Sequence, residues 1–179
     1  MRITPINRME QSVKQCASLI CTNFKDIADY NIAYDIADRS LSDENKINLA
    51  AIDEESNIVG WICGIEQYNI HVWEIQPLVV SKSAHGQGIG RKLVQAFEKE
   101  ASLRGGITII LGIQDEYNET SLSSTNIYEN TFDKIKNIRN LKKSPFEFYL
   151  KTGFKIVGVI PDSNGIGKPD ILIAKKVAY

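Results

Sequence analysis

Three glycines follow an apolar segment at a spacing that suits an anion-binding turn. Residues 78–80 predict a strand, Gly86, Gly88 and Gly90 come next, and the apolar positions that follow predict an amphipathic helix. Glycine lets the backbone approach a ligand closely, and the first N–H groups of a helix have no acceptor within that helix. Together with the positive end of the helix dipole, these groups favour a pyrophosphate.

Spacing excludes two common phosphate-binding loops. A P-loop requires Gly-x4-Gly-Lys-Ser/Thr, and no Lys-Ser/Thr pair follows Gly90. A dinucleotide fingerprint requires Gly-x-Gly-x-x-Gly, whereas the third glycine here comes one residue early. Pro77 interrupts the preceding strand, which indicates an edge, a bulge or a place where strands part. A glycine-rich turn without a ligand is the alternative.

The stretch from His85 to Gly90 resembles the acetyl-CoA loop of the GNAT family of N-acetyltransferases. That loop runs Gln/Arg-x-x-Gly-x-Gly/Ala after a bulged, splayed strand, and His85 stands where Gln or Arg is usual. The resemblance implies acetyl-CoA as the cosubstrate, held mainly by main-chain groups. The residues implied in this contact are Leu78, Val79, Val80, His85, Gly86, Gln87, Gly88, Ile89, Gly90 and Arg91.

The elements around this loop follow the order β-α-α-β-β-β-α-β-α-β-β. Predicted strands cover residues 2–6, 47–53, 57–67, 71–81, 107–111, 155–161 and 169–177, and the continuous apolar run 107–111 suits burial on both faces. Predicted helices cover residues 9–23, 24–39, a stretch from about 90 to Gly105-Gly106, and 145–152, with another helix inside a polar insertion at 113–144.

This order is similar to that of the GNAT fold. We therefore expect an α/β (α+β) single domain over residues 1–179, with a central mixed, splayed sheet flanked by helices. Residues of about 1–70 and 113–144 would form the acceptor side. Residues of about 71–112 and 145–177 would form the acetyl-CoA core.

Acetyl transfer to an amine requires a proton acceptor for the amine, a donor to the thioester carbonyl and a proton for the departing thiolate. Glu74 on the interrupted strand is the candidate base, with a structural ion pair or an exposed strand residue as the alternative. The Leu78 N–H, next to the proline, is the candidate carbonyl donor. Tyr149 is the candidate acid, although an aromatic residue at helical spacing often belongs to a core.

The composition of the chain gives no support to several other classes of protein. The chain has 179 residues, 43% of them hydrophobic and 24% charged, and its net charge of −1 gives no reason to expect nucleic-acid binding. No apolar run suggests a leader or a membrane span. The two histidines fit no metal motif, and three cysteines in apolar segments (Cys16, Cys21, Cys63) suggest core thiols. We therefore expect a cytoplasmic protein without a metal.

Acidic residues suggest a cationic acceptor. Residues 26–55 hold nine acids against two bases, and a second group follows the strand at 107–111: Asp115, Glu116 and Glu119. Two acidic walls would attract a polycation, while ordinary solvated faces are the alternative.

Several segments resemble bacterial aminoglycoside 6'-N-acetyltransferases more specifically: residues 73–80, 105–109, 131–134, 145–149, 155–161 and 168–171. The similarity extends over about 47–177 and includes the insertion. It implies that Glu74 lies in the active site, that Leu78 supplies the backbone donor and that Tyr149 is the acid. It also implies that Asp115 and Tyr68 line the aminoglycoside pocket and that the protein forms homodimers.

Two positions depart from that pattern. Phe24 stands near the acceptor where an aromatic residue, usually Trp, is found, and Gln76 replaces a His of a close subgroup. Three functions therefore stay open: an aminoglycoside 6'-N-acetyltransferase, a GNAT enzyme for another cationic amine such as a polyamine or a peptide N-terminus, and a non-catalytic acetyl-CoA-binding domain.

Overall fold

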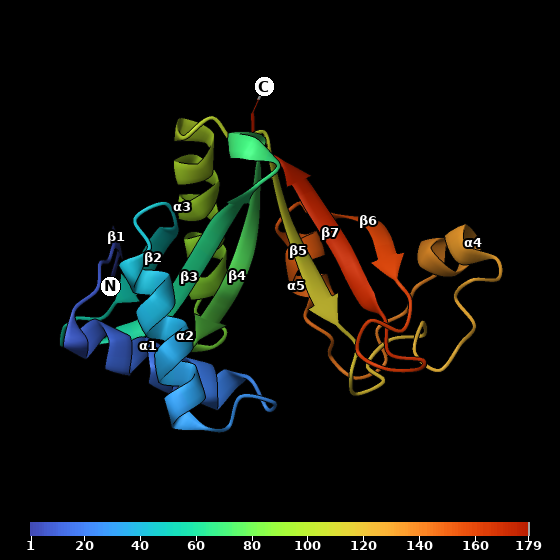
Figure 1. Cartoon of the computed structure of the whole chain (residues 1–179), viewed down its shortest axis with the longest axis horizontal. Coiled ribbons are helices and arrows are strands. Elements are labelled where there is room, and N and C mark those ends of the chain that lie inside the picture. The colour runs from blue at the N-terminus through green and yellow to red at the C-terminus, as the bar shows by residue number, and fades with distance from the viewer. Residues whose placement is uncertain (179) are drawn as a thin grey trace. The chain divides into compact units, whose positions relative to one another are not determined.

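The computed structural model describes residues 1–178 (Figure 1). The chain forms two compact units, described separately below. The first comprises Met1–Ile109 together with Val177 and Ala178, and the second comprises Ile110–Lys176. Within the described residues, none of the helices has the length and apolarity needed to cross a bilayer.

The first unit is an antiparallel sheet with helices on both faces. Its strands follow the order β1-β2-β3-β4. The strands are β1 (Arg2–Pro5), β2 (Ile47–Ile52), β3 (Ile58–Gln67) and β4 (Val72–Val80), and the helices are α1 (Glu10–Asn23), α2 (Tyr30–Ser42) and α3 (Ile89–Leu103), with short 3-10 turns η1 (Asn69–His71) and η2 (Lys82–Ala84).

The second unit carries the remaining strands in the order β5-β7-β6. They are β5 (Thr108–Gln114), which begins in the first unit, β6 (Lys155–Ile160) and β7 (Asp170–Lys176). Two short helices lie between them in the chain, α4 (Thr131–Lys136) inside the predicted insertion and α5 (Phe146–Lys151). β6 and β7 pair antiparallel.

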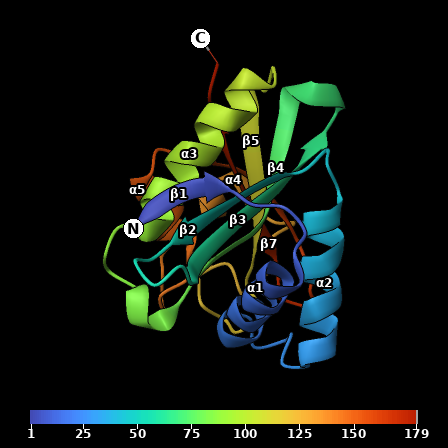
Figure 2. The same ribbon diagram turned by 90° about the vertical axis from the view of Figure 1, so that its left-hand side faces the viewer.

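Alternating residues of β3 explain how helices cover both faces of the first sheet. Gly60 and Gly64 lie under α3, and a Cβ at Gly64 would stand 2.1 Å from the Phe97 ring, so α3 packs directly on the backbone there. Trp61 and Cys63 point the other way into a core formed with α1 and α2. Figure 2 shows α3 on one side of these strands and α1 and α2 on the other.

A buried amide ties α2 to the sheet. Asn48 of β2 donates from Nδ2 to the Ser40 carbonyl at 2.8 Å and accepts from the Trp61 indole N–H at 3.1 Å. Since buried polar groups are costly unless they are paired, this pair of bonds fixes where α2 ends against β2 and β3.

A β-bulge interrupts β4 at the predicted proline. Ile62 pairs with Leu78 and Gly64 with Ile75, so both Gln76 and Pro77 lie opposite Cys63. The extra residue reverses the side-chain alternation along β4. Trp73, Ile75 and Leu78 consequently belong to the α3 face, whereas Glu74 belongs to the α1 face.

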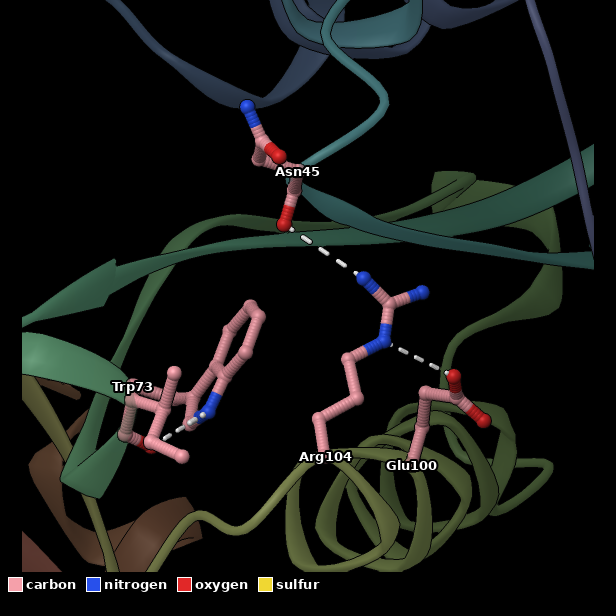
Figure 3. Close-up of polar contacts among 5 residues, drawn as sticks. Asn45, Trp73, Glu100 and Arg104 are labelled. Carbon is pink, nitrogen blue, oxygen red and sulfur yellow. Dashed lines mark hydrogen bonds and ion pairs between the residues drawn. The ribbon is translucent and has the colours of Figure 1, made fainter.

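The end of α3 is anchored near the start of β4. The Arg104 guanidinium lies 3.0 Å from the Glu100 carboxylate and 3.4 Å from the Asn45 carbonyl, and its carbon is 5.7 Å from the Trp73 ring centre (Figure 3). At Gly106, a Cβ would meet the Trp73 ring at 2.6 Å, so only glycine fits there. This packing holds Trp73, and with it the neighbouring Glu74.

Most predicted elements are confirmed, and two details were wrong. The second helix begins at Tyr30 rather than 24, because Asp29 caps it by accepting from the Asn31 N–H at 2.8 Å. The strand β5 is not buried on both faces. Ile109, Leu111 and Ile113 are buried, whereas the residues between them are partly or fully exposed, so only one face is covered completely.

Candidate active site

The glycine loop forms an open turn at the start of α3. Gly86 and Gly88 have φ values of 76° and 75°, a left-handed conformation that disfavours side chains, and no atom lies within 4 Å of a Cβ built on either. The first bond of α3 runs from the Lys92 N–H to the Gly88 carbonyl. The amides of residues 89–91 precede it and have no acceptor within the helix, as an anion-binding turn requires.

The hydrogen bonds between β3 and β4 show which residues of β4 direct their N–H and C=O groups toward β3 and which direct them away. The Ser81 N–H donates to the Val59 carbonyl at 2.8 Å, and Val59 and Ser81 lie opposite each other in the register. Because facing pairs in an antiparallel ladder alternate between bonded and non-bonded, Val80 and Leu78 turn their N–H and C=O groups away from β3. These two residues therefore present main-chain donors and acceptors along the other edge of β4.

His85 contacts that edge directly. Its Nε2 lies 2.9 Å from the Val80 carbonyl oxygen, and its side chain comes from the exposed end of η2. The predicted loop residues His85–Gly90 and the strand residues Leu78–Val80 are thus brought together in the first unit. The loop's own Gln87 donates to the Ser83 carbonyl at 3.3 Å.

Glu74 is half-buried on the α1 face of the sheet. Its Oε2 accepts from the Gln67 amide at 3.0 Å, a bond between adjacent strands. Glu74 forms no ion pair with the described residues. Of the alternatives considered from the sequence, a structural ion pair is therefore wrong, and the carboxylate has one remaining oxygen for another partner.

The acceptor-side residues of the first unit differ in exposure. Tyr68 is 80% exposed at the end of β3, with a left-handed φ of 48°. Phe24 is partly buried and packs against the core of α1 and α2, which leaves only part of its ring for a ligand. Gln76 is exposed on the bulge.

Many of the acids in residues 26–55 have local structural partners. Their carboxylates cap α2, bind backbone amides in turns or pair with Arg8; these residues are Asp29, Asp38, Asp43 and Asp53. For at least these four residues, the alternative of ordinary solvated helix and loop faces is therefore correct. The positions of these four side chains are explained without a ligand.

In the second unit, Tyr149 is buried between aromatic rings. Its ring centre lies 4.9 Å from that of Phe148 and 5.5 Å from that of Phe154, both in edge-on geometry. Burial raises the pKa of the Tyr149 phenol, so this group keeps its proton throughout the physiological pH range. The core interpretation of Tyr149 is correct, and it is compatible with a role as proton donor.

Asp115, also in the second unit, is fully buried. Its oxygens accept from the Glu119 and Thr120 amides and from the Thr120 and Ser123 hydroxyls, which folds the start of the insertion around the carboxylate. As the loop stands, these donors enclose Asp115. Its place in an acceptor pocket stays a prediction, and its evident role is to hold the insertion together.

Comparisons with known proteins decide the family. A profile described as the acetyltransferase (GNAT) family matches residues 11–128. The chain belongs to the GNAT family. A crystal structure of an aminoglycoside 6'-N-acetyltransferase complexed with coenzyme A is 40% identical, with 99% of this chain and 97% of that chain covered and a TM-score of 0.94.

Two further solved structures are similar over the same extent. An aminoglycoside 6'-N-acetyltransferase from Enterococcus faecium is 40% identical, with 99% and 97% of the two chains covered and a TM-score of 0.91. An aminoglycoside 6'-acetyltransferase type Ii is 34% identical, with the same coverage and a TM-score of 0.77. A search of curated proteins found no match. The predicted family and its mixed α/β fold are thereby confirmed.

The residues of this GNAT chain fit acetyl-CoA. The open space above Gly86 and Gly88 and the amides of residues 89–91 suit a pyrophosphate, and the outward groups of Leu78 and Val80 suit the amides of a pantetheine arm. Among residues 1–178, no cluster of three or more His, Cys, Asp or Glu side chains is arranged to bind a metal.

Sequence reasoning missed two features of this site. The contact between His85 and the Val80 carbonyl depends on how η2 folds back, and no spacing rule predicts it. The donors around Asp115 were also missed. Hydroxyl residues a few positions after an aspartate often donate hydrogen bonds to its carboxylate, so Thr120 and Ser123 were a signal that could have been used.

Proposed function

We propose that this GNAT enzyme transfers an acetyl group from acetyl-CoA to the 6'-amine of an aminoglycoside. The observation that carries the proposal is the 40% identity over 99% of the chain to structures of aminoglycoside 6'-N-acetyltransferases, an extent that includes the insertion. The general GNAT pattern lacks that insertion, so the likeness is more specific than the shared fold.

Acetyl-CoA supplies the acetyl group as an activated thioester. Glu74 accepts the proton of the attacking amine, directly or through a water molecule, with its position set by the Gln67 amide. The Leu78 N–H, turned away from β3, donates to the carbonyl oxygen as negative charge develops there. Tyr149 is the proton donor to the departing sulfur as the C–S bond breaks.

Direct transfer is favoured over a covalent enzyme intermediate. Burial raises the pKa of the Cys16 thiol to about 12 and that of the Cys63 thiol to about 11, so neither supplies a thiolate near neutral pH. Cys16 and Cys63 are buried free thiols, as predicted, whereas Cys21 is a free thiol that is only partly buried. The amine nitrogen therefore attacks the carbonyl carbon itself, within a ternary complex.

A pair of drugs that differ at one group tests the proposal. Neomycin carries an amine at the 6' position and paromomycin carries a hydroxyl there, while their other amines are shared. We expect CoA thiol to be released with acetyl-CoA and neomycin, and not with paromomycin. Equal release with both would place the acetyl group on another amine.

Two other outcomes would favour the remaining functions. Release of CoA thiol only with spermidine or a peptide would indicate that the acceptor is another cationic amine. Binding of CoA without release on any amine would indicate a non-catalytic domain.

We further propose that the enzyme is a homodimer that works in the cytoplasm. Exposed apolar side chains in the second unit support the dimer: Tyr128, Phe132, Val157 and Ile160. Free cysteines in the core suit a reducing compartment. Cell fractionation with a disulfide-oxidised marker as reference tests the location.

A further inference from the structure

The His85 side chain is hydrogen-bonded to a main-chain carbonyl, that of Val80, which is proposed to accept a hydrogen bond from the pantetheine arm. Its Nε2 lies 2.9 Å from the Val80 oxygen. A carbonyl can only accept, so Nε2 must carry the hydrogen, either in one neutral tautomer or in the imidazolium. Because Val80 faces away from β3, this carbonyl is one that an incoming amide N–H could otherwise use.

The turn η2 brings His85 back to the strand it has just left. The Ala84 N–H donates to the Ser81 carbonyl at 2.9 Å, and the His85 N–H donates to the Lys82 carbonyl at 3.3 Å. Ala84 is buried and anchors the turn, whereas His85 is exposed. The imidazole can therefore leave Val80 by side-chain rotation, without unfolding the turn.

We propose that His85 is a displaceable cap on the Val80 carbonyl. In the free protein the imidazole satisfies this carbonyl, and a pantetheine amide N–H replaces it when acetyl-CoA binds. The inference rests on the proposed seating of the pantetheine arm along residues 78–80. His85 is thus a positioning residue that competes with the cosubstrate, at the place where the family usually has Gln or Arg.

The chain's two histidines make the cap directly observable. In imidazole ¹⁵N NMR spectra of the free protein, we expect His85 to show a protonated Nε2 with slowed hydrogen exchange, and His71→Ala assigns the signals. Saturating CoA should remove this signature from His85 and leave His71 unchanged. If calorimetry detects CoA binding while the His85 signals stay the same, the proposed cap is wrong and the binding of the cosubstrate is unaffected. If the protein does not bind CoA, both fall together.

A truncated ligand tests the competition itself. S-acetylpantetheine lacks the pyrophosphate and so makes no use of the glycine loop. Removal of one competing hydrogen bond in His85→Ala should lower its Kd by about 2- to 10-fold. His71→Ala, the matched control, should leave this Kd unchanged. An unchanged or higher Kd in His85→Ala would overturn the cap.

Discussion

At the scale of single residues, Glu74 gives the most direct test of the chemistry. Glu74→Gln keeps the shape and the contact with Gln67 but removes the base, so kcat with neomycin should fall about 100-fold or more. Glu66→Gln is the matched control, because Glu66 is exposed on the neighbouring strand and belongs to the opposite face. Its kcat should stay within about twofold of wild type. Comparable losses in both variants would remove Glu74 from its proposed role.

Tyr149 makes a prediction about pH and stability. Its pKa is raised in the folded state above about 10, its ordinary value, so the full contribution to stability is present below pH 10. Above pH 10 the unfolded chain loses this proton while the folded protein keeps it. The free energy of unfolding of wild type should therefore fall, relative to Tyr149→Phe, by about 1.4 kcal/mol per pH unit. Urea unfolding of both proteins at pH 9, 10 and 11 measures this difference, and parallel pH profiles would contradict it.

At the scale of elements, periodicity predicted most boundaries because the apolar rows that it detects are the rows that pack. Trp61 and Cys63 point into one core and Gly60 and Gly64 pack against α3, so both faces of the strand predicted over 57–67 are covered. Pro77 indicated the irregularity in β4 because proline has no N–H to donate to a neighbouring strand. The start of α2 and the accessible face of β5 were missed, since they depend on a capping carboxylate and on coverage by residues distant in the sequence.

The insertion depends on Asp115 in a way that separates structure from substrate binding. In Asp115→Asn, one carboxylate oxygen becomes an amide that cannot accept from the surrounding donors, and each buried donor left unpaired costs about 1–3 kcal/mol. Because the Glu119 and Thr120 amides bind different oxygens of Asp115, the amide that loses its acceptor should exchange about 10- to 100-fold faster. Glu116→Gln, with the same change of charge on the neighbouring residue, should leave this exchange unaltered. A raised KM for the drug with unchanged exchange would instead assign Asp115 to the acceptor.

At the scale of the whole molecule, exposed apolar side chains of the second unit give the proposed dimer a candidate interface, which the sequence pattern alone could not locate. Phe132 of α4 is 86% exposed and Val157 of β6 is 62% exposed, and these two elements contact each other in the second unit. β6 also ends the strand order of that unit, so one of its edges has no partner strand among the described residues.

We expect the protein to sediment at about twice its chain mass of 20.1 kDa. Phe132→Lys places a charge on the proposed interface, which costs far more in a dry contact than in water, and should shift the species to the monomer mass. Leu103→Lys is the control, because Leu103 is also exposed, at 74%, but lies at the end of α3 in the first unit. If the wild-type protein sediments as a monomer at tens of micromolar, the proposed dimer is wrong. If instead both variants stay dimeric, the interface lies elsewhere than on α4 and β6.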